Sequence, residues 1–154
     1  DEVERVINTY FNGDGLLYAK EYYKLLSTLP EYGDFDIIGH FDLITKYDEK
    51  YNVFLNNPQY HSLSEKYMDY ALENDVIFEI NTGAMAKELR TSQYPYINLL
   101  HLMKKRNARI TISSDSHHKD TIDFAFEDIK HMLRDIGFEH IYVLYDGEFK
   151  KDRI

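Results

Sequence analysis

Hydrophobic residues recur along the chain at two spacings, one typical of strands and one typical of helices. Short apolar runs predict buried strands at residues 36–40, 76–81, 109–113 and 140–145. Longer stretches with apolar residues three and four positions apart predict helices at residues 1–11, 16–29, 60–75, 96–107 and 119–137. Gly137 stands where a left-handed cap would close the last of these helices. Helices and strands are therefore expected to alternate along the chain.

This alternation predicts an α/β fold with about four parallel strands, because right-handed crossover helices return the chain to the same edge of a sheet. The chain has 154 residues, 44% of them hydrophobic, which suits a single domain over residues 1–154. Its first predicted helix begins at Asp1 without a lead-in. We therefore expect this domain to be the later part of a longer protein.

Composition narrows the possible partners and ligands. The net charge of −9 disfavours a nucleic-acid surface, because phosphate backbones are bound by clustered positive charge. No apolar run approaches the ~18 residues of a membrane span, and no secretory signal is present, so a cytoplasmic protein without membrane contact is expected. The absence of cysteine leaves only histidine and carboxylate side chains as metal ligands.

Polar residues gather where the first three predicted strands end. The residues concerned are His40 and Asp42, then Glu79 and Asn81, then Asp115 and His117. Parallel strands deliver their carboxyl ends to one edge, where functional side chains meet. Along the third strand Thr111, Ser113 and Asp115 share one face, which is small and polar. Imidazole and carboxylate ligands without sulfur favour zinc, manganese or iron.

Structural explanations compete with this chemistry at each position. Asp115 and His117 could cap the following helix, and His40 with Asp42 could form a turn. Glu79 could orient a metal ligand or make an ordinary interior hydrogen bond. Arg90, in the loop after the second strand, could bind phosphate through its planar fork or could be an exposed loop residue.

Three motifs in order resemble the histidinol-phosphate phosphatases of the polymerase and histidinol phosphatase (PHP) family. They are "DFDIIGHFDLITKY", "FEINTGAMAKELRTSQYPY" and "ITISSDSH", within about residues 34–126. The resemblance implies the carboxyl-terminal part of a distorted (β/α)₇ TIM-like barrel with up to three divalent metals. It also implies that His40, Asp115 and His117 are metal ligands.

The same resemblance suggests the residues that contact substrate. Arg90 would bind phosphate and act in catalysis, Asp42 would support the reaction beside His40, and Lys46 would be a second phosphate-binding cation. Thr45 stands where many relatives carry a further arginine. The family's opening HxH motif is missing from residues 1–35, so we expect the amino-terminal metal motifs to lie upstream. Half a barrel has open sheet edges, which predicts self-association or pairing with the missing half.

The function implied by the resemblance is metal-dependent hydrolysis of histidinol phosphate to histidinol and phosphate, in histidine biosynthesis. The full-length protein would catalyse it, and the 154-residue chain alone is expected to be inactive. Two alternatives stay open. The chain could belong to another PHP-family phosphoesterase, or it could be a structural or binding fragment without catalysis.

Overall fold

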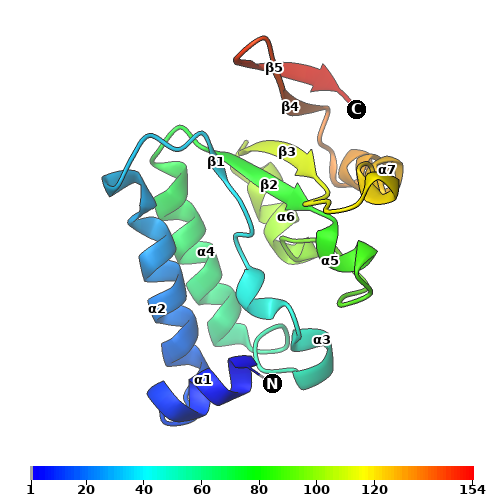
Figure 1. The fold of residues 1–154 in the computed structure, drawn as a ribbon. Helices are drawn as coiled ribbons and strands as arrows, with labels where there is room; N and C mark the ends of the chain where they lie inside the picture. The colour runs from blue at the N-terminus through cyan, green and yellow to red at the C-terminus, as the bar shows by residue number, and fades with distance from the viewer. Residues whose placement is uncertain (1) are drawn as a thin grey trace. The chain divides into compact units, whose positions relative to one another are not determined.

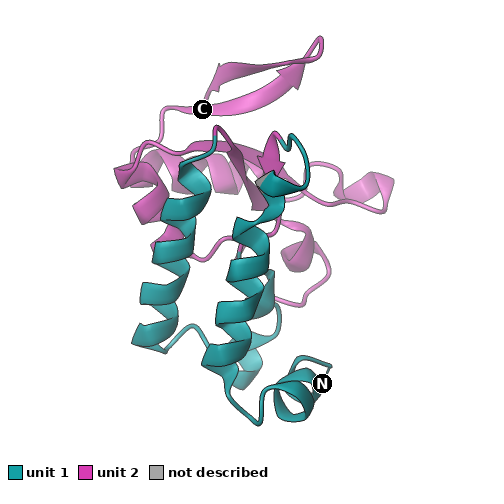
Figure 2. Cartoon of the chain, turned by 90° about the vertical axis from the view of Figure 1, so that its left-hand side faces the viewer, with its two compact units in different colours: residues 1–35, 42–74 teal, residues 36–41, 75–154 magenta. Residues whose placement is uncertain are grey.

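The structure, a computed structural model, describes residues 2–154 and divides them into two compact units. Unit 1 comprises the described residues up to Phe35 together with Asp42–Asn74. Unit 2 comprises Asp36–Phe41 and Asp75–Ile154 (Figure 2). Among the described residues, no helix is both long and apolar enough to span a lipid bilayer.

Unit 1 is helical. Its elements are α1 (Glu2–Tyr10), α2 (Gly15–Ser27), η1 (Leu29–Glu31), η2 (Leu43–Thr45), α3 (Asp48–Tyr51) and α4 (Pro58–Leu72), where η denotes a 3₁₀ helix. Helices α2 and α4 lie side by side (Figure 1). Asp14 caps α2 by accepting from the Leu17 amide, and Asn57 caps α4 in the same way from Gln59. These caps fix where the two long helices begin.

A cluster of tyrosines joins α2 to α4. The Tyr23 and Tyr60 hydroxyls are 2.8 Å apart and fully enclosed, and the Tyr23 ring stacks on Tyr67 with centroids 6.0 Å apart. Burial raises the pKa of Tyr23 and of Tyr60 well above the ordinary value, because the phenolate cannot be solvated there. The cluster is a satisfied core rather than a reactive site.

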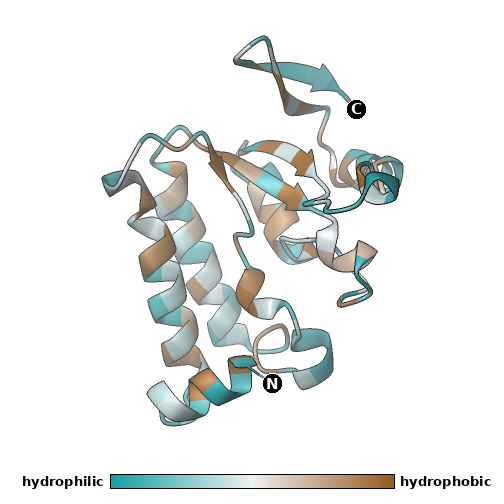
Figure 3. Ribbon diagram, in the orientation of Figure 1, coloured by the Kyte–Doolittle hydropathy of each residue, from teal (hydrophilic) through white to brown (hydrophobic). Residues whose placement is uncertain are grey.

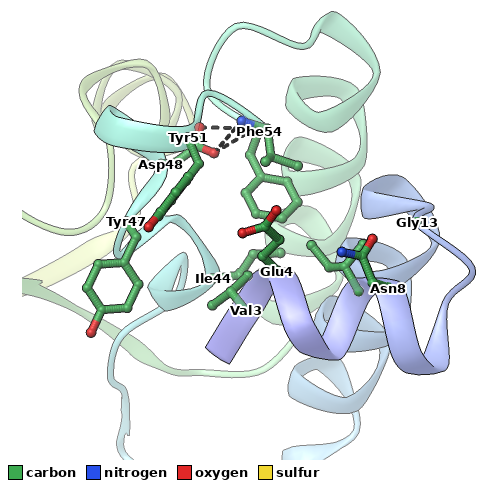
Figure 4. Close-up of a pocket in the computed structure, with 11 residues that line it drawn as sticks. Val3, Glu4, Asn8, Gly13, Ile44, Tyr47, Asp48, Tyr51 and Phe54 are labelled. Atoms are coloured by element: carbon green, nitrogen blue, oxygen red, sulfur yellow. Dashed lines mark hydrogen bonds between the residues drawn. The ribbon is translucent and has the colours of Figure 1, made fainter. Parts of the chain in front are cut away.

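Asp48 holds the turn after α3. Its buried carboxylate accepts from the backbone amides of Val53, Phe54 and Leu55 at 2.6 to 3.0 Å. Beside it lies a pocket of about 220 Å³ between α1 and this turn, shown in Figure 4. Because the Asp48 oxygens already accept from the backbone, they add no ligand donor to the pocket.

Unit 2 contains every strand that the structure describes. Its elements are β1 (Ile37–Ile38), β2 (Ile77–Asn81), α5 (Gly83–Ala86), α6 (Ile97–Lys105), β3 (Arg109–Ser113), η3 (Lys119–Thr121), α7 (Phe126–Ile136), β4 (His140–Tyr145) and β5 (Glu148–Arg153). Strands β1, β2 and β3 form a parallel sheet in that order. The predicted α/β class and the first three parallel strands are therefore confirmed.

One face of the parallel sheet is a dry core. Ile38, Phe78, Ile80 and Ile110 share this face and are buried. The opposite face carries Glu79 beside Thr111, and it lines a groove of about 520 Å³. Strands β2 and β3 are largely hydrophobic in Figure 3, whereas strand β5 is hydrophilic. The sheet thus separates a packed side from a partly polar one.

The fourth predicted strand exists, but its expected parallel pairing is wrong. Strand β4 pairs antiparallel with β5, and the described strands form an open three-stranded sheet and a two-stranded one. Asp146 and Gly147 join them with φ of 53° and 80°, the left-handed values of a tight hairpin turn. The local turn therefore decides the pairing of β4, and the seven-stranded barrel stays a prediction.

The start of the last helix also differs from the sequence prediction. The last helix begins at Phe126 rather than at Lys119, and Gly137 caps it at φ 105° as expected. Before it, the Ser114 hydroxyl donates to the Ile122 carbonyl, and Ala125 has φ 59°. Side-chain hydrogen bonds of this kind compete with helix formation, which explains the late start.

Candidate active site

The residues after β1 bring a histidine against a carboxylate from β2. Glu79 Oε2 accepts from the His40 backbone amide at 3.0 Å and lies 3.0 Å from His40 Nδ1. His40 has φ 52°, a left-handed conformation that aims both its amide and its ring at Glu79. At Gly39 an added Cβ would lie 3.2 Å from Glu79 Oε2, so the neighbouring glycine keeps this approach open.

Asp115 reaches the other side of the same imidazole from the end of β3. Its Oδ2 lies 3.6 Å from His40 Nε2 and 3.6 Å from Lys87 Nζ. Gly83, at the start of α5, lets these segments approach: an added Cβ would lie 2.7 Å from the Ser114 carbonyl oxygen. His40, Glu79 and Asp115 therefore come together from the ends of three neighbouring parallel strands.

Electrostatics couple His40 to Glu79. The hydrogen bond with Glu79 raises the pKa of His40 above its ordinary value, although partial burial works in the opposite direction. Burial alone would raise the pKa of Glu79, but the hydrogen bonds from His40 outweigh it and the pKa is lowered. Near neutral pH Glu79 is therefore an anion that accepts from His40 Nδ1–H.

Two donors of this cluster fit a divalent metal. An imidazole whose Nδ1–H donates to a carboxylate presents its Nε2 lone pair, the usual arrangement of metal-bound histidine. His40 Nε2 and Asp115 Oδ2 face one another in this way. Across residues 2–154, however, no three or more histidine and acidic side chains form a group that could hold one ion. The pair is part of a possible metal site rather than a complete one.

His117 does not join His40 and Asp115 in the structure. Its Nδ1–H donates to the Asp115 carbonyl oxygen at 2.9 Å, and the residue is exposed. This hydrogen bond fixes the tautomer that leaves Nε2 as an acceptor, as a metal ligand requires. The spacing in "DSH" thus places two of the three expected ligands on one short segment without bringing their donor atoms together.

Arg90 is buried in the loop after α5, with 4% of its surface exposed. Its ζ-carbon lies 4.4 Å from the Tyr94 ring centroid, and its Nη2 donates to the Ser92 hydroxyl at 3.2 Å. The Tyr94 ring also stacks on His40, with centroids 6.0 Å apart and planes 22° apart. One aromatic ring therefore contacts both Arg90 and His40.

The other two predicted site residues belong to unit 1. Asp42 is fully buried and precedes η2, so its carboxylate is closed to solvent. Lys46 is half-buried, with its ammonium 5.4 Å from the Tyr47 ring centroid. Their catalytic and phosphate-binding roles stay predictions.

Comparison with known proteins finds three similar proteins that carry the same name. A protein named probable histidinol-phosphatase from Schizosaccharomyces pombe is 34% identical over 113 residues, 72% of this chain. Proteins of the same name from Deinococcus radiodurans and Clostridium acetobutylicum are 29% and 23% identical over 80% and 79% of the chain. The chain is thus similar to three proteins named probable histidinol-phosphatase over most of its own length. No protein-family model matches it.

The predicted resemblance to histidinol-phosphatases is thereby confirmed. The matched region covers 37%, 44% and 48% of those three proteins, so the chain spans less than half of their length.

Sequence reasoning missed two residues of this candidate site. Lys87 follows α5, is 46% exposed at its side chain, and faces Asp115. Tyr94 is paired through its backbone with Asn81, the last residue of β2. The short helix α5 brings the chain from Asn81 to Lys87 in six residues. No pattern in the sequence predicts this short helix. Tyr94 precedes Pro95, and a residue before proline is typical of a turn or loop, which was the one sequence signal at this position.

Proposed function

We propose that this chain supplies part of the active site of a histidinol-phosphatase that hydrolyses histidinol phosphate to histidinol and phosphate. The observation that carries the proposal is the convergence of His40, Glu79 and Asp115 at the ends of three parallel strands. The relationship to proteins named probable histidinol-phosphatase supports the choice of substrate.

In this proposal His40 and Asp115 hold a divalent metal such as zinc, manganese or iron, with His117 and residues elsewhere completing up to three metal sites. A bound divalent metal supplies Lewis acidity, which lowers the pKa of a water molecule toward neutrality. Glu79 keeps His40 in the tautomer whose Nε2 is free of a proton. It also fixes the ring through the His40 backbone amide.

Positive side chains would neutralise the phosphate oxygens. Lys87 is the exposed candidate beside Asp115, and Arg90 is a buried one that cannot swing to follow a ligand. Lys46 and Asp42, in unit 1, keep their predicted roles in phosphate binding and in supporting the reaction. Cations placed in advance favour the transition state, because charge builds up on the non-bridging oxygens.

The proposed reaction is a hydrolysis in which water oxygen bonds to phosphorus and the phosphorus–oxygen bond to histidinol breaks. One proton of the water passes to the departing alkoxide, giving histidinol and hydrogen phosphate. Arg90 and Lys87 would bind and orient the phosphate group through this displacement. Their positions decide which phosphorus–oxygen bond faces the attacking water.

The test is phosphate release from histidinol phosphate by the protein that contains this chain, measured with added manganese or zinc. Replacing Asp115 by Ala should lower turnover by on the order of 100-fold or more, because a direct metal ligand is lost. Asp120→Ala is the matched control, since Asp120 is an exposed acid that pairs with His118 at 3.4 Å. An Asp115→Ala protein with undiminished turnover would refute the assignment. A panel of other phosphate monoesters would identify a different phosphoesterase.

A further inference from the structure

The loop between α5 and α6 carries an aromatic residue that links the two chemical parts of the proposed site. Tyr94 lies in this loop four positions after Arg90. Its backbone is anchored, since the Asn81 amide donates to the Tyr94 carbonyl at 2.8 Å and the Tyr94 amide donates to the Asn81 carbonyl at 2.9 Å. The end of β2 therefore fixes the base of this side chain.

The ring of Tyr94 is enclosed, with 2% of the residue exposed. It stacks on the His40 imidazole and lies under the Arg90 guanidinium, whose ζ-carbon is 4.4 Å from the ring centroid. Planar stacking on a buried ring restricts a guanidinium in position and tilt. The Ser92 hydroxyl restrains the same guanidinium from within the loop.

We propose that Tyr94 is a positioning residue that sets the location of the Arg90 guanidinium relative to the His40 imidazole. The inference rests on the proposed function, in which Arg90 contacts phosphate and His40 binds metal. A phosphate ester bridging a metal and a cation requires a set separation between them, and side chains on loops otherwise vary in position. An anchored ring in contact with both groups provides that separation.

Three variants and one control test the inference. Tyr94→Phe keeps the ring, and Tyr94→Leu removes it. Arg90→Lys removes the planar fork while keeping the charge. Tyr142→Leu is the control, since the Tyr142 ring also lies under a guanidinium, that of Arg109 at 5.4 Å. Arg109 is the first residue of β3, at the end of the strand away from Asp115 and the candidate site.

The first measurement is NMR on the protein that contains this chain, following the His40 ring and the Arg90 Nε–H resonances. Tyr94→Leu should shift both together, because both lose the ring current of the same aromatic side chain. Tyr94→Phe and Tyr142→Leu should leave both in place. If Tyr94→Leu does not fold, cross-relaxation in the unmutated protein decides: the Tyr94 ring protons should report both the Arg90 δ-methylene and the His40 ring. Contact with only one of them overturns the inference.

The second measurement is the affinity of the protein that contains this chain for inorganic phosphate in the presence of manganese. Tyr94→Leu should weaken it about fivefold, in the direction of Arg90→Lys, with Tyr94→Phe within about twofold of the unmutated chain. Weakening by Arg90→Lys but not by Tyr94→Leu overturns the role of Tyr94 and leaves the proposed function standing. Unchanged affinity in Arg90→Lys, or no phosphate binding at all, overturns the phosphate contact of Arg90 and the positioning role with it.

Discussion

The two units hold their carboxylates in different ways. In unit 1 the Asp48 carboxylate accepts from the backbone amides of the next turn, and the residue is 4% exposed. In unit 2 the Glu79 carboxylate accepts from the amide and the ring of His40, and the Asp115 carboxylate, whose side chain is 38% exposed, faces His40 and Lys87. A carboxylate whose oxygens all accept from nearby backbone amides stabilises the fold. A carboxylate that faces side chains at the exposed edge of the sheet can exchange these partners for a ligand.

The largest expected effect tests the structural half of this comparison. Asp48→Ala should lower the free energy of unfolding by about 3 kcal/mol, because buried amides lose a charged acceptor. Urea denaturation measures the loss, and Asp48→Asn, which keeps one acceptor oxygen, should lose less. A loss below about 1 kcal/mol for Asp48→Ala would show that the turn does not depend on this carboxylate.

Glu79→Gln tests the other half. It should weaken manganese or zinc binding by about tenfold, because Glu79 orients and polarises His40. The pKa of His40 should fall toward its ordinary value, since the hydrogen bond with Glu79 is the main cause of its elevation. Metal titration and NMR titration of the His40 ring measure the two effects. A His40 pKa that stays raised in Glu79→Gln would contradict the assigned coupling.

The buried tyrosines of unit 1 should make the free energy of unfolding depend on pH in the alkaline range. Because burial raises the folded-state pKa of Tyr23 and Tyr60, their contribution to stability is complete below the unfolded pKa of about 10 and is lost as pH rises above it. Between pH 10 and 11 the loss should reach about 1 kcal/mol per tyrosine.

Tyr23→Phe removes one of these ionisations and should reduce the alkaline loss measured by denaturation at pH 8 and pH 11. Tyr10→Phe is the control, since Tyr10 is 73% exposed. Equal alkaline losses in Tyr23→Phe and in the unmutated chain would exclude Tyr23 as a source of the pH dependence.

Lys87→Met has the smallest expected effect on stability. Its ammonium pairs with Asp115 at 3.6 Å, but both side chains are more than a third exposed, and such pairs contribute little. The free energy of unfolding should change by less than about 0.5 kcal/mol. A larger loss would make Lys87 a structural residue and weaken the contrast between the two units.

The hydrophobic pattern predicted the elements of unit 2 better than their pairing. The runs at 76–81 and 109–113 became β2 and β3 because their apolar residues face a dry core. The run at 140–145 is a strand too, but it pairs antiparallel with β5 instead of joining the predicted parallel sheet. The dipeptide "DG" at Asp146 and Gly147 favours a two-residue hairpin, so the sequence does contain a signal for the antiparallel pairing of β4.

The sequence by itself determined that His40 and Asp115 would lie at the same edge of the sheet, because parallel strands end at one edge and each residue comes two positions after a strand. Only the tertiary structure decided that His117 turns back to the backbone and that Lys87 and Tyr94 join the site. These placements depend on left-handed backbone at His40 and Asp115 and on loop packing between residues distant in sequence. Hydrophobic periodicity records which face of an element is buried, and it carries no information about such contacts.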